Sequence, residues 1–294
     1  MIDDILFVTL DSCRFDTFEK AFDSGLVPNI ASIGPLHKAF SPSYFTYGSH
    51  AAFWMGFTPG VVGCESPFLN PKAGKLFRLT YSGFIKNKND QGLLLQGKNI
   101  IDGLRNSGYS AIGTGSVEWF NTSTDTGSVL AEPFEHFWFS GNTWSLNAQL
   151  SWINERLSEL PEEKPRFVFL NVGETHVPYW HEGASWERWP SPCVPFGNEH
   201  CSATECSRRQ TSCLEWVDRQ LATLLDSFQD GTVLICADHG DCWGEDGLWE
   251  HGISHPATLT VPLLLRVRGV PVEKTQVEEN VVTSPSRFRS AFSR

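Results

Sequence analysis

Short apolar runs alternate along this chain with segments in which apolar residues recur every three to four positions. The runs predict buried strands at residues 5–10, 109–113, 166–172, 232–237 and 262–267. The helical spacing predicts helices at residues 15–22, 99–107, 146–160 and 213–228. Strands that alternate with helices indicate a three-layer α/β/α fold, in which helices cover both faces of a mostly parallel central sheet.

Polar residues that can carry chemistry follow three of these strands. Asp11 ends the first run, Glu174 and His176 follow the third, and Asp238 with His239 follows the fourth. In open α/β sheets, ligands bind at the carboxyl ends of the strands. We therefore expect these three distant segments to converge on one site.

The segment after residue 237 carries the strongest chemical signal. Asp238 and His239 can reach one cation, and oxygen and imidazole ligands suit Zn²⁺ or Mn²⁺. The alternative is that Asp238 only caps a helix and His239 is incidental. His251 and His255 follow in the same stretch, which favours a metal site over that alternative.

Thr46 offers a hydroxyl at the start of a further expected helix. A helix N-terminus favours a bound anion, because its free N–H groups and dipole are positive. A threonine hydroxyl is a weak nucleophile unless a base or a metal activates it. Taken alone, this segment favours simple capping of the helix by Thr46.

Together these segments resemble the alkaline phosphatase superfamily, which includes sulfatases, nucleotide pyrophosphatase/phosphodiesterases, and phosphoethanolamine or phosphoglycerol transferases. The resemblance runs from about residue 5 to about residue 265. Residues 8–16 look like the D-S-x-R-x-D opening, whose first Asp binds metal, and residues 27–30 look like the P-N-I/L element that follows. Residues 174–179 are similar to T-H-x-P-Y, whose His faces the substrate. Residues 238–252 match the signature S-D-H-G-E/D, then G-E, then H-G.

The same resemblance implies which residue is the nucleophile. Phosphodiesterase members carry T-x-x-N-H, with Gly six residues after the His and Pro three further on. Thr46, His50, Gly56 and Pro59 stand at these spacings. Type I sulfatases instead carry C-x-P-S-R, whose Cys becomes formylglycine. Thr46, Gly48 and His50 replace the Cys, Pro and Arg, which argues against an ordinary sulfatase.

The resemblance further implies one divalent cation, Mn or Zn, held by Asp11, Asp238 and His239, with the Thr46 hydroxyl as a further ligand. The metal would activate Thr46 for attack on phosphorus, giving a phospho-threonine intermediate. A second, weaker ion stays an alternative, with candidate ligands Glu174, His176, His251 and His255. One of three histidines would stabilise the phosphoryl oxygens or protonate the leaving group: His176, His251 or His255. The expected substrate-binding residues are His50, Glu174, His176 and His255.

Four of the eight cysteines lie in or beside an insert at about residues 181–211, which is rich in Pro, Gly and Trp. They are Cys193, Cys201, Cys206 and Cys213. Their spacing does not match a C-x-x-C zinc knuckle, so unpaired loop thiols are the main interpretation, and a structural zinc or a disulfide are the alternatives. Tryptophans at 180, 186 and 189 suggest that the insert forms an aromatic lid. This insert and residues 61–96 are expected to decide substrate choice.

Composition limits the classes of partner. The 294 residues include 23 Lys+Arg and 34 Asp+Glu, a net charge of −11, which argues against non-specific nucleic-acid binding. An anionic substrate stays compatible with this charge, because a bound metal reverses the local field. No apolar run is long enough to span a membrane, and no secretory signal is recognisable, so we expect a cytoplasmic protein with no membrane partner. We expect one catalytic domain over residues 1–270 and a polar tail over 271–294.

The sequence thus predicts a metal-dependent hydrolase or phosphotransferase that acts on a phosphate mono- or diester of a small, soluble, anionic kind. Hydrolysis of a sulfate or phosphonate ester is the alternative among enzymes. A catalytically inactive protein of this fold that binds a metal or ligand is the alternative from another class. The joint presence of Thr46, Asp11, Asp238 and His239 argues against the inactive protein.

Overall fold

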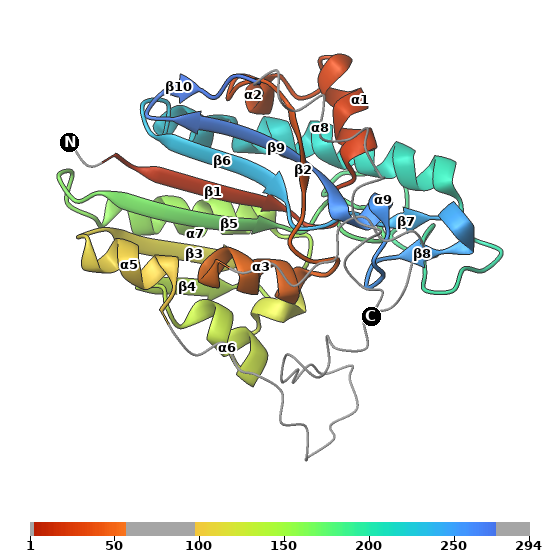
Figure 1. The fold of residues 1–294 in the computed structure, drawn as a ribbon, viewed down its shortest axis with the longest axis horizontal. Helices are drawn as coiled ribbons and strands as arrows, with labels where there is room; N and C mark the ends of the chain where they lie inside the picture. Colours follow the sequence, from red (N-terminus) through yellow and green to blue (C-terminus); the bar gives the residue numbers. More distant parts are fainter. Residues whose placement is uncertain (1–2, 57–97, 275–294) are drawn as a thin grey trace, which may run out of the picture.

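A mixed, eight-stranded β-sheet forms the centre of the protein (Figure 1). We describe it from a computed structural model that covers residues 3–56 and 98–274. The strands follow the order β10-β9-β6-β1-β5-β3-β4, and β2 pairs with β9. Five strands are parallel: β1 (Ile5–Leu10), β3 (Ser110–Gly115), β4 (His136–Phe139), β5 (Arg166–Val172) and β6 (Thr232–Ala237). Three pair in the antiparallel direction: β2 (His37–Phe40), β9 (Thr260–Val267) and β10 (Val270–Pro271).

The central strands are mainly apolar because both faces of the sheet are buried. Along β1, Leu6, Val8 and Leu10 join one hydrophobic cluster, whereas Phe7 joins a second cluster on the opposite face. Side chains alternate between faces along a strand, so one continuous apolar run supplies both clusters.

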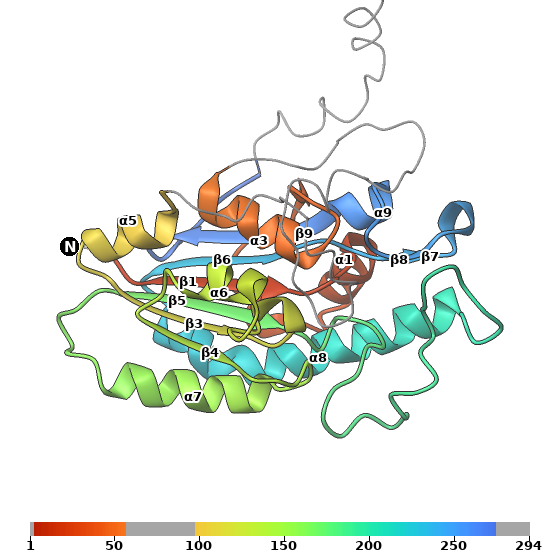
Figure 2. The same ribbon diagram turned by 90° about the horizontal axis from the view of Figure 1, so that it is seen from below.

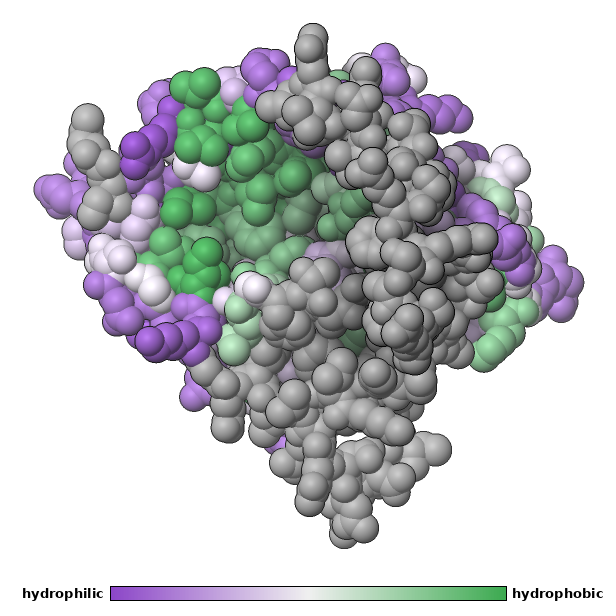
Figure 3. Space-filling view, in the orientation of Figure 1, coloured by the Kyte–Doolittle hydropathy of each residue, from purple (hydrophilic) through white to green (hydrophobic). Residues whose placement is uncertain are grey.

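Helices cover the two faces, as the sequence predicts (Figures 1 and 2). One face carries α1 (Phe15–Asp23), α2 (Pro28–Ala31), α7 (Leu146–Ser158) and α8 (Ala203–Ser227). The other carries α3 (Thr46–Met55), α5 (Ile100–Asn106) and α6 (Asp125–Ala131). Figure 3 shows hydrophobic side chains gathered over β9, β6 and β1, so helices of the described residues cover this second face incompletely.

The longest helix, α8, begins ten residues earlier than predicted, at Ala203 instead of 213. Ser202 starts it, because its side chain accepts a hydrogen bond from the backbone N–H of Glu205. The insert therefore ends at residue 202, and Cys206 and Cys213 are helical.

The remaining short elements surround the carboxyl ends of the central strands. They are the hairpin of β7 (Cys242–Trp243) and β8 (Trp249–Glu250), the 3₁₀ turns η1 (Glu118–Phe120) and η2 (Glu245–Gly247), and α9 (Pro256–Leu259). Among the helices of residues 3–56 and 98–274, none combines the length and apolar character needed to cross a bilayer. The proposed substrate-selecting residues 61–96 and nearly all of the expected tail lie outside the described residues.

Candidate functional site

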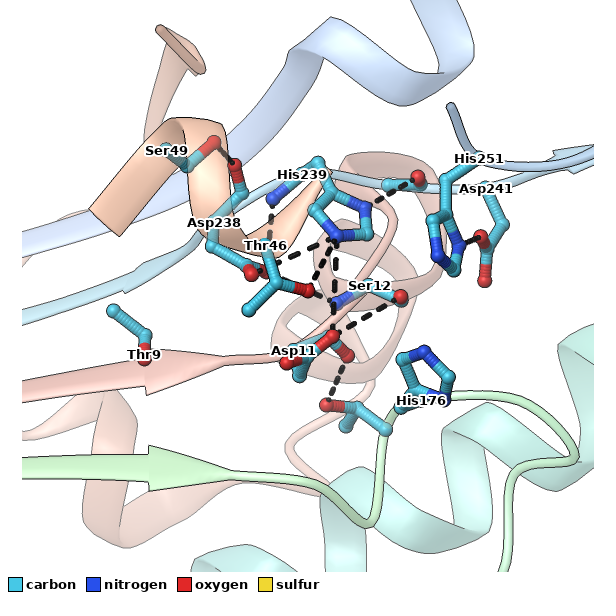
Figure 4. Close-up of polar contacts among 12 residues, drawn as sticks. Thr9, Asp11, Ser12, Thr46, Ser49, His176, Asp238, His239, Asp241 and His251 are labelled. Carbon is cyan, nitrogen blue, oxygen red and sulfur yellow. Dashed lines mark hydrogen bonds and ion pairs between the residues drawn. The ribbon is translucent and has the colours of Figure 1, made fainter. Parts of the chain in front are cut away.

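The carboxyl ends of β1, β5 and β6 meet at one edge of the sheet, with β1 in the middle. Leu10, the last residue of β1, is paired with Val172 on one side and Ala237 on the other. The next residues along the chain therefore leave the sheet side by side. Figure 4 shows that Asp11, Asp238 and His239 point toward one another there.

Three side chains converge around the Nε2 atom of His239, which makes a group of four. This atom lies 3.3 Å from Thr46 Oγ1, 3.6 Å from Asp238 Oδ2 and 3.9 Å from Asp11 Oδ1. Ligands about 2.0–2.2 Å from a tetrahedral ion are roughly 3.3–3.6 Å apart. The separations to Thr46 and Asp238 fall in this range and the one to Asp11 is slightly longer, so the group fits one ion at its centre. All four side chains are fully buried.

The donor set has the chemistry of a cation site. Asp238 Oδ2 is buried and has no hydrogen-bond partner, an arrangement that is costly unless a cation supplies one. Burial and then the Asp11 charge raise the pKa of Asp238. Burial, assisted by His251, lowers the pKa of His239 to about 3, so its ring is neutral. Its Nδ1–H donates to the Gly240 carbonyl, 3.0 Å away, which leaves the Nε2 lone pair free to bind a metal.

Neighbouring polar groups fix the two carboxylates. Asp238 Oδ1 accepts from the backbone N–H groups of Ser12, at 3.1 Å, and His239, at 2.9 Å. Asn171 Nδ2 donates to Asp11 Oδ2 at 3.2 Å. Each carboxylate thus keeps one oxygen toward His239 while the protein holds the other, and the Ser12 hydroxyl also donates to Asp11 Oδ1 at 3.3 Å.

Thr46 is the first residue of α3, and Phe45 is its N-cap, with no side-chain capping bond. The Thr46 hydroxyl therefore points at His239 instead of capping the helix (Figure 4). His50, one turn later, hydrogen-bonds through Nδ1 to the Thr46 carbonyl at 2.8 Å and through Nε2 to the Thr9 hydroxyl at 3.0 Å. Burial lowers the pKa of His50 to about 4. We predicted that His50 binds substrate, whereas the structure places it in the core as a support for the start of α3.

A second potential metal group consists of His239, Asp241 and His251. Sequence reasoning missed Asp241 as a site residue, although it is the last residue of the D-H-G-D motif. The Nδ1–H of His251 donates to Asp241 Oδ1 at 2.7 Å. Burial opposes the charge on His251, but Asp241 outweighs it and raises the pKa of His251 to about 9. Because this group shares His239 with the first, the described residues fit one ion with an Asp241–His251 pair beside it.

The other two predicted histidines have different surroundings. The ring of His176 lies 5.2 Å from that of His251, which in turn lies 4.5 Å from that of His239. His255 instead caps α9, because its Nδ1 accepts from the backbone N–H of Ala257 at 3.0 Å. The structure thus brings His176 and His251 to the site but gives His255 a local backbone partner.

Glu174, which we predicted to bind substrate, also has a backbone partner. Its Oε1 accepts from the N–H of Leu146, at the start of α7, at 2.9 Å. Its Oε2 is buried without a hydrogen-bond partner, and burial raises the pKa of Glu174 to about 7. The structure thus places Glu174 outside both potential metal groups, with one oxygen on the start of α7.

Two further residues tie the loops of the site together. Arg14 pairs with Glu245 at 2.6 Å and lies over the ring of Trp243, which joins the first and last motifs of the sequence. Gln210 on α8 donates from Nε2 to the carbonyls of Ser12 and Thr175, at 3.0 Å each. Gln210 went unnoticed in the sequence because it falls in the part of α8 that was expected to be a loop.

The four cysteines of the insert do not come together at one point. Cys193, Cys206 and Cys213 are fully buried in a small cluster with Tyr179. Cys201 lies apart, beside an exposed asparagine. Neither potential metal group found among the described residues contains a cysteine, which disfavours the structural zinc considered above.

Similarity to known proteins is confined to three-dimensional structure: no family model and no curated protein sequence matches the chain. Lipooligosaccharide phosphoethanolamine transferase A (EptA) from Neisseria meningitidis superposes with a TM-score of 0.59 at 13% identity, over 92% of this chain and 48% of that one. A protein in the alkaline phosphatase superfamily from Vibrio parahaemolyticus gives 0.51 at 15% identity, over 91% and 61%. A zinc complex of the C-terminal periplasmic domain of EcEptC from Escherichia coli gives 0.56 at 13% identity, over 91% and 73%. The chain therefore spans about half to three-fifths of the length of the first two proteins, and the likeness shows a shared fold.

Proposed function

From the alkaline phosphatase superfamily fold, which this chain shares, we propose that it is a metal-dependent enzyme that hydrolyses or transfers a phosphate ester through Thr46. One observation carries the proposal. The Thr46 hydroxyl lies at the start of α3, 3.3 Å from the free nitrogen of His239 and beside two buried carboxylates. A hydroxyl held among metal-ligand atoms is the arrangement that an activated nucleophile needs.

Asp11, Asp238, His239 and Thr46 would hold the ion. When bound, it lowers the pKa of the Thr46 hydroxyl and polarises a phosphoryl oxygen. The carboxylates and the neutral imidazole suit Zn²⁺ or Mn²⁺, and the zinc complex of EcEptC supports zinc. The orphaned Asp238 Oδ2 supports at least one ion.

The chain's own residues supply the remaining steps. The Thr46 hydroxyl loses its proton to solvent and its oxygen attacks phosphorus. The bond from phosphorus to the leaving oxygen breaks, and the phosphoryl group moves to Thr46. The first N–H groups of α3 have no partner within the helix and stabilise the phosphoryl oxygens. His251 donates a proton from Nε2 to the leaving oxygen, because its Nδ1 is occupied by Asp241. Water, or an acceptor alcohol in a transferase, then gives a proton to His251 Nε2 as its oxygen attacks phosphorus. The bond from phosphorus to the Thr46 oxygen breaks, and Thr46 regains its proton from solvent.

The substrate that we propose is a small anionic ester, and the location that we propose is the cytoplasm. EptA is a transferase by name, so transfer to an acceptor alcohol is as good a candidate as hydrolysis. Competition between water and added alcohols such as ethanolamine or glycerol would distinguish the two, because a transferase forms the phosphorylated alcohol as its main product.

The decisive experiment combines metal analysis with three variants, Thr46→Ala, Thr46→Ser and Asp238→Ala. Turnover of p-nitrophenyl phosphate, bis-p-nitrophenyl phosphate and p-nitrophenyl sulfate is measured with Zn²⁺, Mn²⁺ or EDTA. We expect about one metal per chain in the wild type and Thr46→Ala, but none in Asp238→Ala. Turnover should fall by about 10³-fold or more in Thr46→Ala and by much less in Thr46→Ser, which keeps the hydroxyl.

Two outcomes would contradict the proposal. Full activity in Thr46→Ala would exclude the covalent mechanism. A wild type that contains no metal and takes none up on titration would support the inactive binding protein instead.

A further inference from the structure

A chain of hydrogen bonds runs from Asp241 away from the proposed metal into the protein. The Tyr179 hydroxyl donates to Asp241 Oδ2 at 2.7 Å, and Trp243 Nε1 donates to the Tyr179 oxygen at 2.7 Å. Tyr179 is fully buried and Trp243 is 6% exposed, so water does not compete for these groups. Neither residue is part of the mechanism described above.

The direction of this chain is fixed by chemistry. An indole N–H can only donate and an ionised carboxylate can only accept. The single proton of Tyr179 must therefore point at Asp241, because Trp243 occupies the acceptor side of the hydroxyl. The two rings also pack edge to face, with centroids 5.7 Å apart.

Asp241 is consequently held at both oxygens. Tyr179 binds Oδ2, and the His251 Nδ1–H binds Oδ1. His251 thus presents Nε2, the nitrogen that does not bind Asp241, and its ring lies beside the rings of His239 and His176 (Figure 4). The orientation of His251 therefore depends on a carboxylate that Tyr179 keeps from rotating.

Tyr179 and Trp243 are themselves anchored. The Tyr179 N–H donates to the His176 carbonyl at 2.8 Å, and Trp186 Nε1 donates to the Tyr179 carbonyl at 3.1 Å. The Arg14 guanidinium lies 4.4 Å from the centre of the Trp243 ring. The backbone of Tyr179 and the ring of Trp243 are therefore both fixed. A donor held in this way is suited to keep a catalytic group in one geometry.

We propose that Tyr179 is a positioning residue for the phosphoryl-transfer reaction, and that it acts by locking the Asp241–His251 pair with its hydroxyl directed by Trp243. This role rests on the proposed function, because Tyr179 would position His251 in its role as the proton donor.

The kinetic test compares Tyr179→Phe, Trp243→Phe and the double variant of the full chain, with p-nitrophenyl phosphate and Zn²⁺. Loss of orientation should lower kcat by about tenfold in Tyr179→Phe, with KM changed less than about twofold. Trp243→Phe should have a smaller effect, and the double variant should be no worse than Tyr179→Phe, because both act through one chain. Tyr109→Phe is the matched control, since its hydroxyl also donates at 2.8 Å, to the Asp3 carbonyl at the opposite edge of the sheet.

A second readout needs no activity. In metal-free protein with ¹⁵N-labelled histidine, the Nδ1–H proton of His251 gives an NMR signal that a His251→Asn variant identifies. We expect this signal to move or to broaden by exchange with water in Tyr179→Phe and to stay in place in Tyr109→Phe. If the wild type proves inactive, the proposed function fails, and the NMR comparison still decides whether Tyr179 positions His251.

An unchanged His251 signal together with an unchanged kcat in Tyr179→Phe would overturn the proposal. A fully additive double variant would also overturn it, because it would show two independent effects. If Tyr179→Phe fails to fold, Trp243→Phe becomes the deciding variant. An unchanged kcat and an unchanged His251 signal in Trp243→Phe would then overturn the proposal.

Discussion

Glu174 illustrates how a buried acid at the site can serve the backbone instead of a substrate. Its side chain is 1% exposed, one oxygen binds the start of α7, and the other has no hydrogen-bond partner. Burial raises the pKa of Glu174 from 4.5 to about 7, so the fold favours the protonated form. A raised pKa in the folded state means that stability is fully present below pH 4.5 and is lost as the pH rises through 7.

We therefore predict that Glu174→Gln removes a pH dependence of stability. A shift of about 2.5 pKa units corresponds to about 3 kcal/mol, most of it lost by the wild type between about pH 5 and pH 8. Urea unfolding of both proteins at these pH values measures the difference, with the exposed Glu162→Gln as control. Parallel pH profiles for the wild type and Glu174→Gln would contradict the prediction.

At the scale of single residues, the sequence pointed to the residues that meet at the candidate metal group, but it did not reveal the residues that support them. Asp11 and Asp238 were expected to meet because each follows a buried strand of one sheet, and the family resemblance gave them the role of metal ligands. The roles of His50 and His255 were harder to predict. A histidine's role depends on the groups around it, and those come from distant segments. Even so, His50 follows Thr46 by one helical turn, and that spacing already allows the observed bond to the Thr46 carbonyl.

At the scale of elements, the start of α8 shows where periodicity misleads. Its first turns bury Cys206, Arg209 and Gln210, which are polar or small, so no apolar stripe marks them as helical. A local signal was present, since Ser202 is followed three residues later by Glu205, the spacing of a helix N-terminus. Burying these polar groups is tolerated because their hydrogen bonds are satisfied by the neighbouring loops.

Gln210 gives a prediction for this element. Gln210→Glu keeps the shape but cannot donate to the carbonyls of Ser12 and Thr175, and it buries a carboxylate. We expect the free energy of unfolding to fall by about 2–4 kcal/mol. Metal affinity should fall as well, because the Ser12 N–H binds Asp238 and the Thr175 hydroxyl binds the Asp11 carbonyl.

Urea unfolding and zinc titration test this prediction, with Gln229→Glu as the matched control on the exposed residues just after α8. Equal stability and equal zinc affinity in Gln210→Glu and Gln229→Glu would show that Gln210 does not hold the two loops.

At the scale of the whole molecule, the strand order explains why the chemistry converges. β1 lies between β5 and β6, so three segments far apart in sequence end at neighbouring positions. The alternating pattern predicted this parallel core. It did not predict that β9 runs antiparallel to β6, because an apolar run carries no information on direction. The segment between β6 and β9 carries His239 and His251, and it leads the chain back along β6 in the opposite direction.

This convergence buries two carboxylates side by side, an arrangement that destabilises the metal-free protein. Asp238→Asn keeps the Oδ1 atom that accepts from Ser12 and His239, and its new amide can donate to the neutral His239 Nε2. We predict that without metal the variant is more stable than the wild type by about 1–2 kcal/mol. With zinc at about 1,000 times its Kd, the wild type alone should gain about 4 kcal/mol, so the order reverses.

Thermal and urea unfolding in EDTA and in a series of zinc concentrations measure both parts of this prediction, with the exposed Asp23→Asn as control. The midpoint of the wild type and of the control should rise with zinc concentration, because an ion that binds only the folded state shifts the equilibrium by mass action. The midpoint of Asp238→Asn should stay constant. An equal gain in Asp238→Asn would place the ion elsewhere, and a wild type that is the more stable protein in EDTA would show that Asp11 and Asp238 do not repel each other in the fold.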